Sequence, residues 1–310
     1  MIVTNEEKTV TGDISDVKST LFEYAWWLKK EGYAESTIET RFKLLRILSK
    51  RGANLHDPES IKEVIAQQKW VNKRKMNAAD AYSAFLRMKG MTWNPPRYRP
   101  IIKLPFIPTE SELDALISGC GSVTSIFLQL LKETAMRAGE AQQVTWNDID
   151  FERKTIRVTP EKGSNPRIFK LSTKLTSRLQ TLRTKKKSKE VFGKYLRNRR
   201  RLFQKQRATL ARKLENPRLK EIKFHTFRHW KATMLYHQTK DLLFVQRFLG
   251  HRSVQNTLKY IQLDEALFSD EDEQYVCKAA STVKEAMKLI EFGFQHVTDF
   301  DGVKLFKKRM

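Results

Sequence analysis

The sequence predicts a mainly α-helical protein with two domains, a small β-hairpin and a short α/β tail. Apolar residues recur at helical spacing through most of the chain, and strict apolar–polar alternation is confined to short stretches. Five prolines between residues 93 and 108 separate two helical regions, and this density excludes a helix. A chain of 310 residues is long enough for two hydrophobic cores.

The expected first domain covers residues 15–91, after a polar and flexible N-terminus at residues 1–14. It contains four helices, which begin near Asp16, Ser36, Pro58 and Lys75. Glycines end the first two helices, and Asp57 is expected to cap the third. Lysines and arginines crowd the outer faces, which marks this domain as a candidate for nucleic-acid binding.

Residues 92–108 are predicted to form an extended, semi-rigid linker, because prolines favour that conformation. Arg97, Arg99 and Lys103 lie in it, so the linker is expected to touch a polyanion. A plain spacer is the alternative interpretation.

The second domain is expected to span residues 109–262. Thr109 and Glu112 have the spacing of a capping box, which opens a helix. A strongly apolar helix follows from Ser122 to Glu133. Residues 155–159 and 167–171 then alternate apolar and polar, which predicts a β-hairpin with Lys162 in its turn.

Three further helices are expected toward the end of this domain. The first spans residues 226–240, the second is capped by Asp241 and ended by Gly250, and the third is capped by Ser253 and ends near Tyr260. Residues 263–310 are expected to form an acidic tether followed by a strand, a helix and two strands. We assign this small α/β tail no specific role, apart from possible contact with a neighbouring protomer.

The charge of the chain points to a polyanionic partner. Lysine and arginine number 59 against 35 acidic residues, for a net charge of +24, which nucleic acid explains most simply. Residues 183–223 alone hold 17 basic and 3 acidic residues, so we favour a nucleic-acid face over a solvated one. A merely basic or ribosome-associated protein is the alternative.

The remaining composition excludes several classes of protein. Cys120 and Cys277 form neither a disulfide framework nor a zinc-binding pattern. The N-terminus lacks the features of a signal peptide, and no apolar run is long enough to span a membrane. We therefore expect a cytoplasmic protein, associated with the nucleoid of a prokaryote.

The second domain carries the side chains needed to attack a phosphodiester without a metal. A phenol can be a covalent nucleophile, guanidiniums can clamp a phosphate, and lysine and histidines can move protons. The candidates are Arg137, Lys162, His225, Arg228, His251 and Tyr260.

Each candidate also has a structural interpretation when taken singly. Arg137 could cap the preceding helix, Arg228 could pair with Glu140, and Tyr260 could be a core residue. Taken together, His225 and Arg228 lie three apart at the start of a helix and face the same way. His229 is expected to point elsewhere. His237 and His296 have no evident partners and are interpreted as structural.

The segments ETAMRAGE, HTFRHW, LGHRS and TLKY resemble the four boxes of the tyrosine recombinase (integrase) family, in the family's order. Arg228 and His251 are 23 residues apart, and His251 and Tyr260 are 9 apart, which is also similar. Lys162 falls where the family keeps its lysine. The resemblance covers about residues 15–262, and the tail is similar to tails of some archaeal members. Ala135 departs from the family's usual glycine.

The resemblance implies a fold and a mechanism. A helical core-binding domain of the SAM-like type and a catalytic domain would clamp double-stranded DNA like a C. Arg137 and Arg228 would hold the scissile phosphate, supported by His225 and His251. Tyr260 would attack phosphorus to give a 3′-phosphotyrosine.

Further roles follow from the same resemblance. Lys162 would protonate the leaving 5′ oxygen, and Glu140 would orient Arg137 or stabilise the fold. No metal or cofactor is expected, and the active form would be a tetramer on DNA. The expected DNA-binding residues are Arg41, Lys43, Lys73, Arg74, Arg97, Arg99, Arg199, Arg200, Arg201 and Arg247.

Two other functions compete with a site-specific recombinase. A type IB topoisomerase shares the chemistry but relaxes supercoils as a monomer, and a non-catalytic DNA-binding protein could use the same scaffold. The compact helical first domain and the full set of six residues favour the recombinase. The sequence does not distinguish integration or excision of a mobile element, dimer resolution and transposition.

Overall fold

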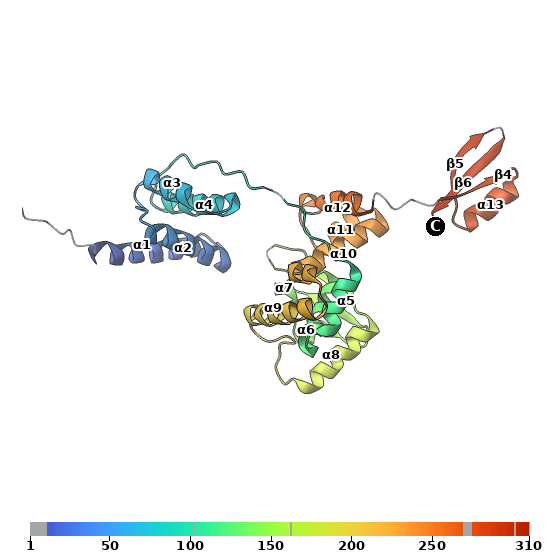
Figure 1. The fold of residues 1–310 in the computed structure, drawn as a ribbon, viewed down its shortest axis with the longest axis horizontal. Helices are drawn as coiled ribbons and strands as arrows, with labels where there is room; N and C mark the ends of the chain where they lie inside the picture. Colours follow the sequence, from blue (N-terminus) through green and yellow to red (C-terminus); the bar gives the residue numbers. More distant parts are fainter. Residues whose placement is uncertain (1–10, 102, 162, 269–274, 301, 310) are drawn as a thin grey trace, which may run out of the picture. The chain divides into compact units, whose positions relative to one another are not determined.

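The computed structural model describes residues 11–101, 103–161, 163–268, 275–300 and 302–309 (Figure 1). The chain divides into two compact units, Met1–Lys103 (unit 1) and Leu104–Met310 (unit 2). The division falls inside the proline-rich segment. None of the described helices is long and apolar enough to cross a membrane.

Unit 1 is built from four helices around one core. They are α1 (Thr11–Lys30), α2 (Glu35–Lys50), α3 (Pro58–Gln67) and α4 (Asn72–Met88). The buried hydroxyls of Tyr24 and Tyr82 donate to backbone carbonyls at 2.7 and 3.1 Å, so these polar atoms are satisfied within the core. α1 begins earlier than expected, within the segment interpreted as flexible. Polar residues are compatible with a helix start because the first turn is solvated.

The helices of unit 2 form most of its core. They are α5 (Glu110–Gly119), α6 (Ser122–Thr134), α7 (Ala138–Gln142), α8 (Thr173–Lys185), α9 (Leu196–Lys213), α10 (Phe224–Thr239), α11 (Leu242–Leu249) and α12 (Lys259–Phe268). Short 3-10 turns occur at Trp146–Asp148, Pro217–Glu221 and Val254–Asn256. The expected capping box of Thr109 and Glu112 is present. Phe127 on the largely buried α6 packs against Phe192 and Phe224 at ring-centroid distances of 5.0 Å.

The predicted hairpin belongs to a three-stranded antiparallel sheet. Its strands are β1 (Ile149–Asp150), β2 (Thr155–Val158) and β3 (Arg167–Lys170), in the order β1-β2-β3. The β2–β3 pairing confirms the hairpin. β1 was not predicted, since two residues are too few to show an alternating pattern.

The last helix of this core differs from the expected one. We expected a helix ending near Tyr260 and an exposed tether from residue 263, and both expectations are wrong. Tyr260 lies at the start of α12, which continues to Phe268, and Leu263 and Asp264 are buried. The acidic residues suggested exposure, but Asp264 pairs with His237 on α10 and with Lys240 directly after it, which local sequence could not show.

Residues 275–309 contain the expected α/β tail. It consists of β4 (Tyr275–Ala280), α13 (Val283–Glu291), β5 (Gln295–Phe300) and β6 (Val303–Arg309). The sheet order is β4-β6-β5, and α13 lies against the sheet (Figure 1). Its core is small and centres on Ala280, Ala286 and Phe306.

Candidate active site

Arg137 and Glu140 form the first part of the site, where α6 ends and α7 begins. Ala135 has a left-handed conformation (φ 51°) that ends α6. The Glu140 carboxylate accepts from the Arg137 backbone N–H at 2.8 Å and from its Nη1 at 3.0 Å. Burial alone would raise the pKa of Glu140. These hydrogen bonds and the charges of Arg167 and Arg137 instead keep the Glu140 pKa below its ordinary value.

Arg228 lies on α10 and is almost completely buried, with 1% of its surface exposed. Its Nη1 donates to the Ala135 carbonyl and its Nη2 to the Leu249 carbonyl, both at 2.7 Å. Burial lowers the pKa of Arg228 to about 10, with Arg137 acting in the same direction, so it remains charged at neutral pH. The ion pair with Glu140 considered from sequence is not the one formed, because Arg167 occupies that place at 2.7 Å.

Arg167 links the hairpin to the turn after α11, a connection that the sequence analysis missed. Its Nη1 donates to the Leu249 carbonyl, which Arg228 also uses. Ser164 Oγ and the Asn165 N–H donate to the Gly250 carbonyl at 2.8 and 3.1 Å. Gly250 has φ 66°, and a Cβ there would lie 2.8 Å from Arg167 Nη1. Glycine therefore suits both the backbone conformation and the close approach.

His251 follows this turn and is held by a buried hydroxyl. Its Nδ1 lies 2.9 Å from the Oγ1 of Thr257. Burial, followed by the charges of Arg228 and Arg137, lowers the pKa of His251 to about 3, so the imidazole is neutral at pH 7. Lys162 belongs to the hairpin loop that contacts Gly250, but it lies outside the described residues.

Tyr260 is buried near the start of α12, with 1% of its surface exposed. Its hydroxyl lies 3.2 Å from His229 Nδ1. Burial raises the pKa of Tyr260 to about 12, although the charges of Arg228 and Arg137 oppose this. One turn later, Asp264 pairs with His237 at 2.7 Å and with Lys240 at 2.6 Å, which attaches α12 to α10.

His229 and Lys259 are site residues that the sequence analysis did not select. The expectation that His229 points elsewhere than the other candidate side chains is wrong. Residues four apart on a helix share a face. The His229 ring accordingly lies edge-to-face with the His225 ring, with centroids 4.5 Å apart. Lys259 Nζ lies 5.3 Å from the centre of the Tyr260 ring, and burial followed by Arg228 lowers the pKa of Lys259. The sequence offered one signal for each: His229 directly follows the candidate Arg228, and Lys259 directly precedes the candidate Tyr260. His237 and His296, for which no partner was evident, pair with Asp264 and Asp299.

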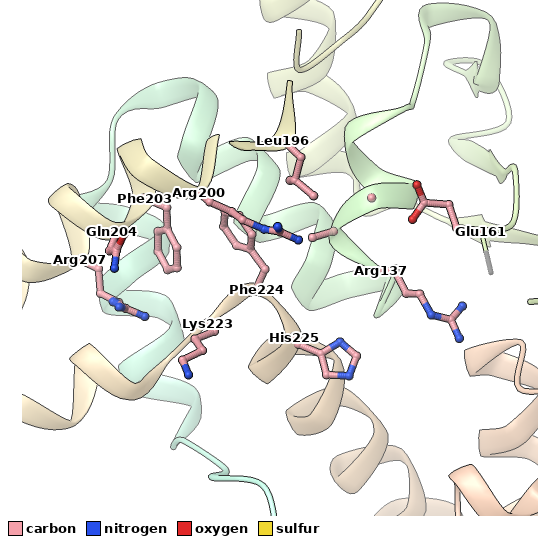
Figure 2. A pocket seen from close by; sticks show the side chains of 12 residues that line it. Arg137, Glu161, Leu196, Arg200, Phe203, Gln204, Arg207, Lys223, Phe224 and His225 are labelled. Carbon is pink, nitrogen blue, oxygen red and sulfur yellow. The ribbon is translucent and has the colours of Figure 1, made fainter. Parts of the chain in front are cut away.

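A cleft of about 620 Å³ adjoins Arg137 and His225. Figure 2 shows further basic side chains around it, with Arg200 and Arg207 on α9 and Lys223 just before α10. Because α9 presents residues 200, 203, 204 and 207 at helical spacing, one face of this basic helix lines the cleft. The arrangement suits an extended anion larger than a single phosphate.

The expected DNA-binding residues differ in their exposure. Arg41 is half-buried, with its guanidinium 4.5 Å from the Tyr33 ring. Arg199 is half-buried beside the rings of Phe127 and Phe192 and donates to the Phe192 carbonyl. The exposed members of the set are Lys43, Lys73, Arg74, Arg97, Arg99, Arg200, Arg201 and Arg247.

Comparison with known proteins assigns the family. Residues 109–266, which contain every part of this site, match the phage integrase family. The chain belongs to the phage integrase family. The resemblance read from the four boxes is confirmed, and with it the enzyme class, a tyrosine recombinase that cleaves and rejoins DNA at specific sites. The topoisomerase and non-catalytic alternatives are not favoured.

Individual relatives of this integrase-family chain agree with the assignment. Tyrosine recombinase XerA of Saccharolobus solfataricus is 29% identical over 160 residues, covering 50% of this chain and 51% of that protein. XerA of Pyrococcus horikoshii is 25% identical over 266 residues, covering 83% and 91%. The integrase of transposon Tn1549, solved in complex with transposon right-end DNA, has a similar fold. Its TM-score is 0.61 at 16% identity, covering 81% of this chain and 99% of that one. This fold similarity confirms the predicted fold class.

Proposed function

We propose that this recombinase cuts double-stranded DNA by attack of Tyr260 on phosphorus, forming a 3′-phosphotyrosine. The observation that carries the proposal is the convergence in unit 2 of the buried Tyr260 and Arg228 with the partly buried Arg137 and His251. These groups come from four separate segments of the chain. A phenol facing two guanidiniums suits an attack on a phosphodiester, because the cations stabilise the charge that develops in the transition state.

The roles of the individual groups are proposed from the family resemblance. Arg137 and Arg228 hold the non-bridging oxygens of the scissile phosphate, and Glu140 orients Arg137. His251 and His225 donate or accept hydrogen bonds at the same phosphate. The bond between Tyr260 Oη and phosphorus forms as the bond to the 5′ oxygen breaks. That oxygen takes up a proton, for which Lys162 remains the candidate on the basis of the family resemblance.

The DNA is held by exposed cations on both units. The cleft beside Arg137 continues the active site along α9, where Arg200 and Arg201 are exposed. Exposed lysines and arginines of unit 1 add non-specific affinity. We remove Arg41 and Arg199 from the proposed contact set, since both are half-buried and their guanidiniums pack against aromatic rings of their own units.

The biological setting is proposed more broadly. Recombination requires two DNA sites held together, so the active form would be a tetramer on DNA, acting in the cytoplasm on nucleoid or mobile-element DNA. Integration or excision of a mobile element, resolution of chromosome or plasmid dimers, and transposition are the candidate roles. The relative solved with transposon DNA supports the DNA substrate but does not choose between these roles.

The first test uses supercoiled plasmid DNA with EDTA present and no ATP, followed by an SDS quench. Wild-type protein should give a protease-sensitive protein–DNA adduct, and Tyr260→Phe should give none. An adduct from both proteins would place the nucleophile elsewhere, with Tyr236 and Tyr195 examined next. Joined or inverted segments among the products would indicate recombination, whereas relaxed circles alone would indicate a topoisomerase.

A further inference from the structure

His229 contacts both the buried phenol of Tyr260 and the ring of the exposed His225. Its Nδ1 lies 3.2 Å from the Tyr260 hydroxyl, and its ring contacts that of His225 at 4.5 Å between centroids. Tyr260 is buried, His229 is partly buried and His225 is exposed. The three side chains therefore form a continuous line from the reacting oxygen to solvent.

The phenol must lose its proton as it attacks phosphorus, because the new oxygen–phosphorus bond leaves a neutral ester oxygen. Hydroxide in solution has poor access, since only 1% of the Tyr260 surface is exposed. Among the described residues, His229 has the nitrogen placed within hydrogen-bonding distance of this hydroxyl. Hydrogen-bonding distance is the geometric requirement for a general base.

We propose that His229 is a catalytic residue that accepts the Tyr260 proton through Nδ1 and passes a proton from Nε2 toward His225 and solvent. The proposal rests on Tyr260 being the nucleophile. In the balanced step, the Tyr260 oxygen bonds to phosphorus, its proton moves to His229, and the electron pair of the broken bond stays on the 5′ oxygen. The 5′ oxygen is protonated by a separate acid.

Because of the charges around His229, its basicity should depend on whether DNA is bound. Burial, followed by the electrostatic influence of His225, Lys259, Arg228 and His251, lowers the pKa of His229 to about 3 in the free protein. The imidazole is therefore neutral and has one free lone pair. A DNA phosphate held by Arg137 and Arg228 brings a negative charge that offsets the nearby cations Arg228 and Lys259. Binding should thus raise the basicity of His229 when the phenol is about to react.

The first test needs no DNA. In the free protein labelled with ¹⁵N-histidine, the proposal requires a proton on His229 Nε2 and a bare Nδ1 that accepts from the phenol. The His229 signals are identified by their loss in His229→Asn. Tyr260→Phe should move the Nδ1 resonance of His229, because the donated hydrogen bond disappears. A proton on Nδ1 in the wild type, which would make His229 a donor to Tyr260, overturns the proposal.

The second test measures the rate of adduct formation on supercoiled plasmid. His229→Asn keeps an amide able to hydrogen-bond the hydroxyl but cannot carry its proton away. We expect a loss of about 100-fold or more at pH 7, because the amide cannot act as a base and hydroxide has poor access to the buried phenol. His296→Asn, a change in the remote tail, should react like wild type.

Other outcomes separate this proposal from the proposed function. If His229→Asn forms the adduct at the wild-type rate, or clearly faster than His229→Ala does, then His229 only positions Tyr260. Either outcome would refute proton transfer. An adduct in Tyr260→Phe would reject the nucleophile instead. Circular dichroism of each variant shows whether it is folded, and the ¹⁵N measurement decides the tautomer even if the plasmid contains no usable site.

Discussion

At the scale of the residue, the site depends on unusual local conformations and charge states. Ala135 adopts a left-handed conformation at the end of α6, and its carbonyl accepts from Arg228. L-residues other than glycine pay about 1–2 kcal/mol for this conformation. The family's usual glycine before the Met-Arg pair is explained by this backbone requirement. The protein tolerates alanine because the surrounding contacts determine the turn.

We expect Ala135→Gly to raise the free energy of unfolding by about 0.5–1 kcal/mol, since relief of the left-handed strain exceeds the extra entropy of the unfolded glycine. Urea denaturation would measure the change. Ala208→Gly is the matched control, because Ala208 is exposed within α9 and should lose about 1 kcal/mol. Equal destabilisation of both variants would contradict the argument.

The neutral histidines predict how stability depends on pH. His229 and His251 have pKa values lowered to about 3, whereas unfolded histidine titrates near 6.5. Between these values the unfolded state binds more protons, so stability should be full above pH 6.5 and fall as the pH drops toward 3. The loss between pH 7 and 5 should be on the order of 1 kcal/mol per histidine. Chemical denaturation at the two pH values would measure it, with a smaller loss in His229→Asn.

At the scale of the element, the nucleophile is positioned by the attachment of α12 to α10. Tyr260 and Asp264 lie one turn apart on α12, and they contact His229 and His237, which lie two turns apart on α10. The two helices lie side by side in unit 2 (Figure 1). The position of the phenol therefore depends on an ion pair one helical turn away from it.

Asp264→Asn should loosen α12, because His237 and Lys240 lose their charged partner. We expect a loss of about 1–3 kcal/mol in stability, faster amide hydrogen exchange in α12 and slower adduct formation. Glu265→Gln is the control, since Glu265 is exposed on the same helix. Unchanged exchange in α12 of Asp264→Asn would show that apolar packing alone holds the helix.

At the scale of the whole molecule, the net charge of +24 governs binding to DNA. The affinity should fall linearly on a logarithmic scale with salt concentration. Neighbouring arginines on α9 provide a matched pair. Arg200→Ala should reduce the salt slope by about 1, because Arg200 is exposed at the cleft. Arg199→Ala should leave the slope unchanged and lower stability, because its guanidinium packs against the rings of Phe127 and Phe192. A flat affinity from low to moderate salt would contradict the electrostatic account.

The tail offers a test of assembly. Its core centres on three buried residues, while Met287, Ile290 and Phe292 are exposed, so further burial would stabilise it. Deleting residues 270–310 should weaken tetramer formation on DNA more than binding of a single protomer. Analytical ultracentrifugation with and without DNA would compare the two proteins. Unchanged tetramer formation by the truncated chain would rule out this role.

The sequence by itself predicted most of the helices, the β2–β3 hairpin, the family and five described candidates for the site. Helical spacing, caps and breakers act over a few residues, so they can be read locally: Asp57, Thr109 and Asp241 each cap the helix expected of them. The order and spacing of the four boxes identified the recombinase, because the chemistry needs those side chains together.

Only the tertiary structure decided which groups meet. Arg228 bonds to a carbonyl 93 residues away, and His229 meets Tyr260 across 31 residues. Arg167, rather than Arg228, forms the buried pair with Glu140. Such choices depend on how helices pack and on which buried polar atoms still need partners, and no local pattern carries that information.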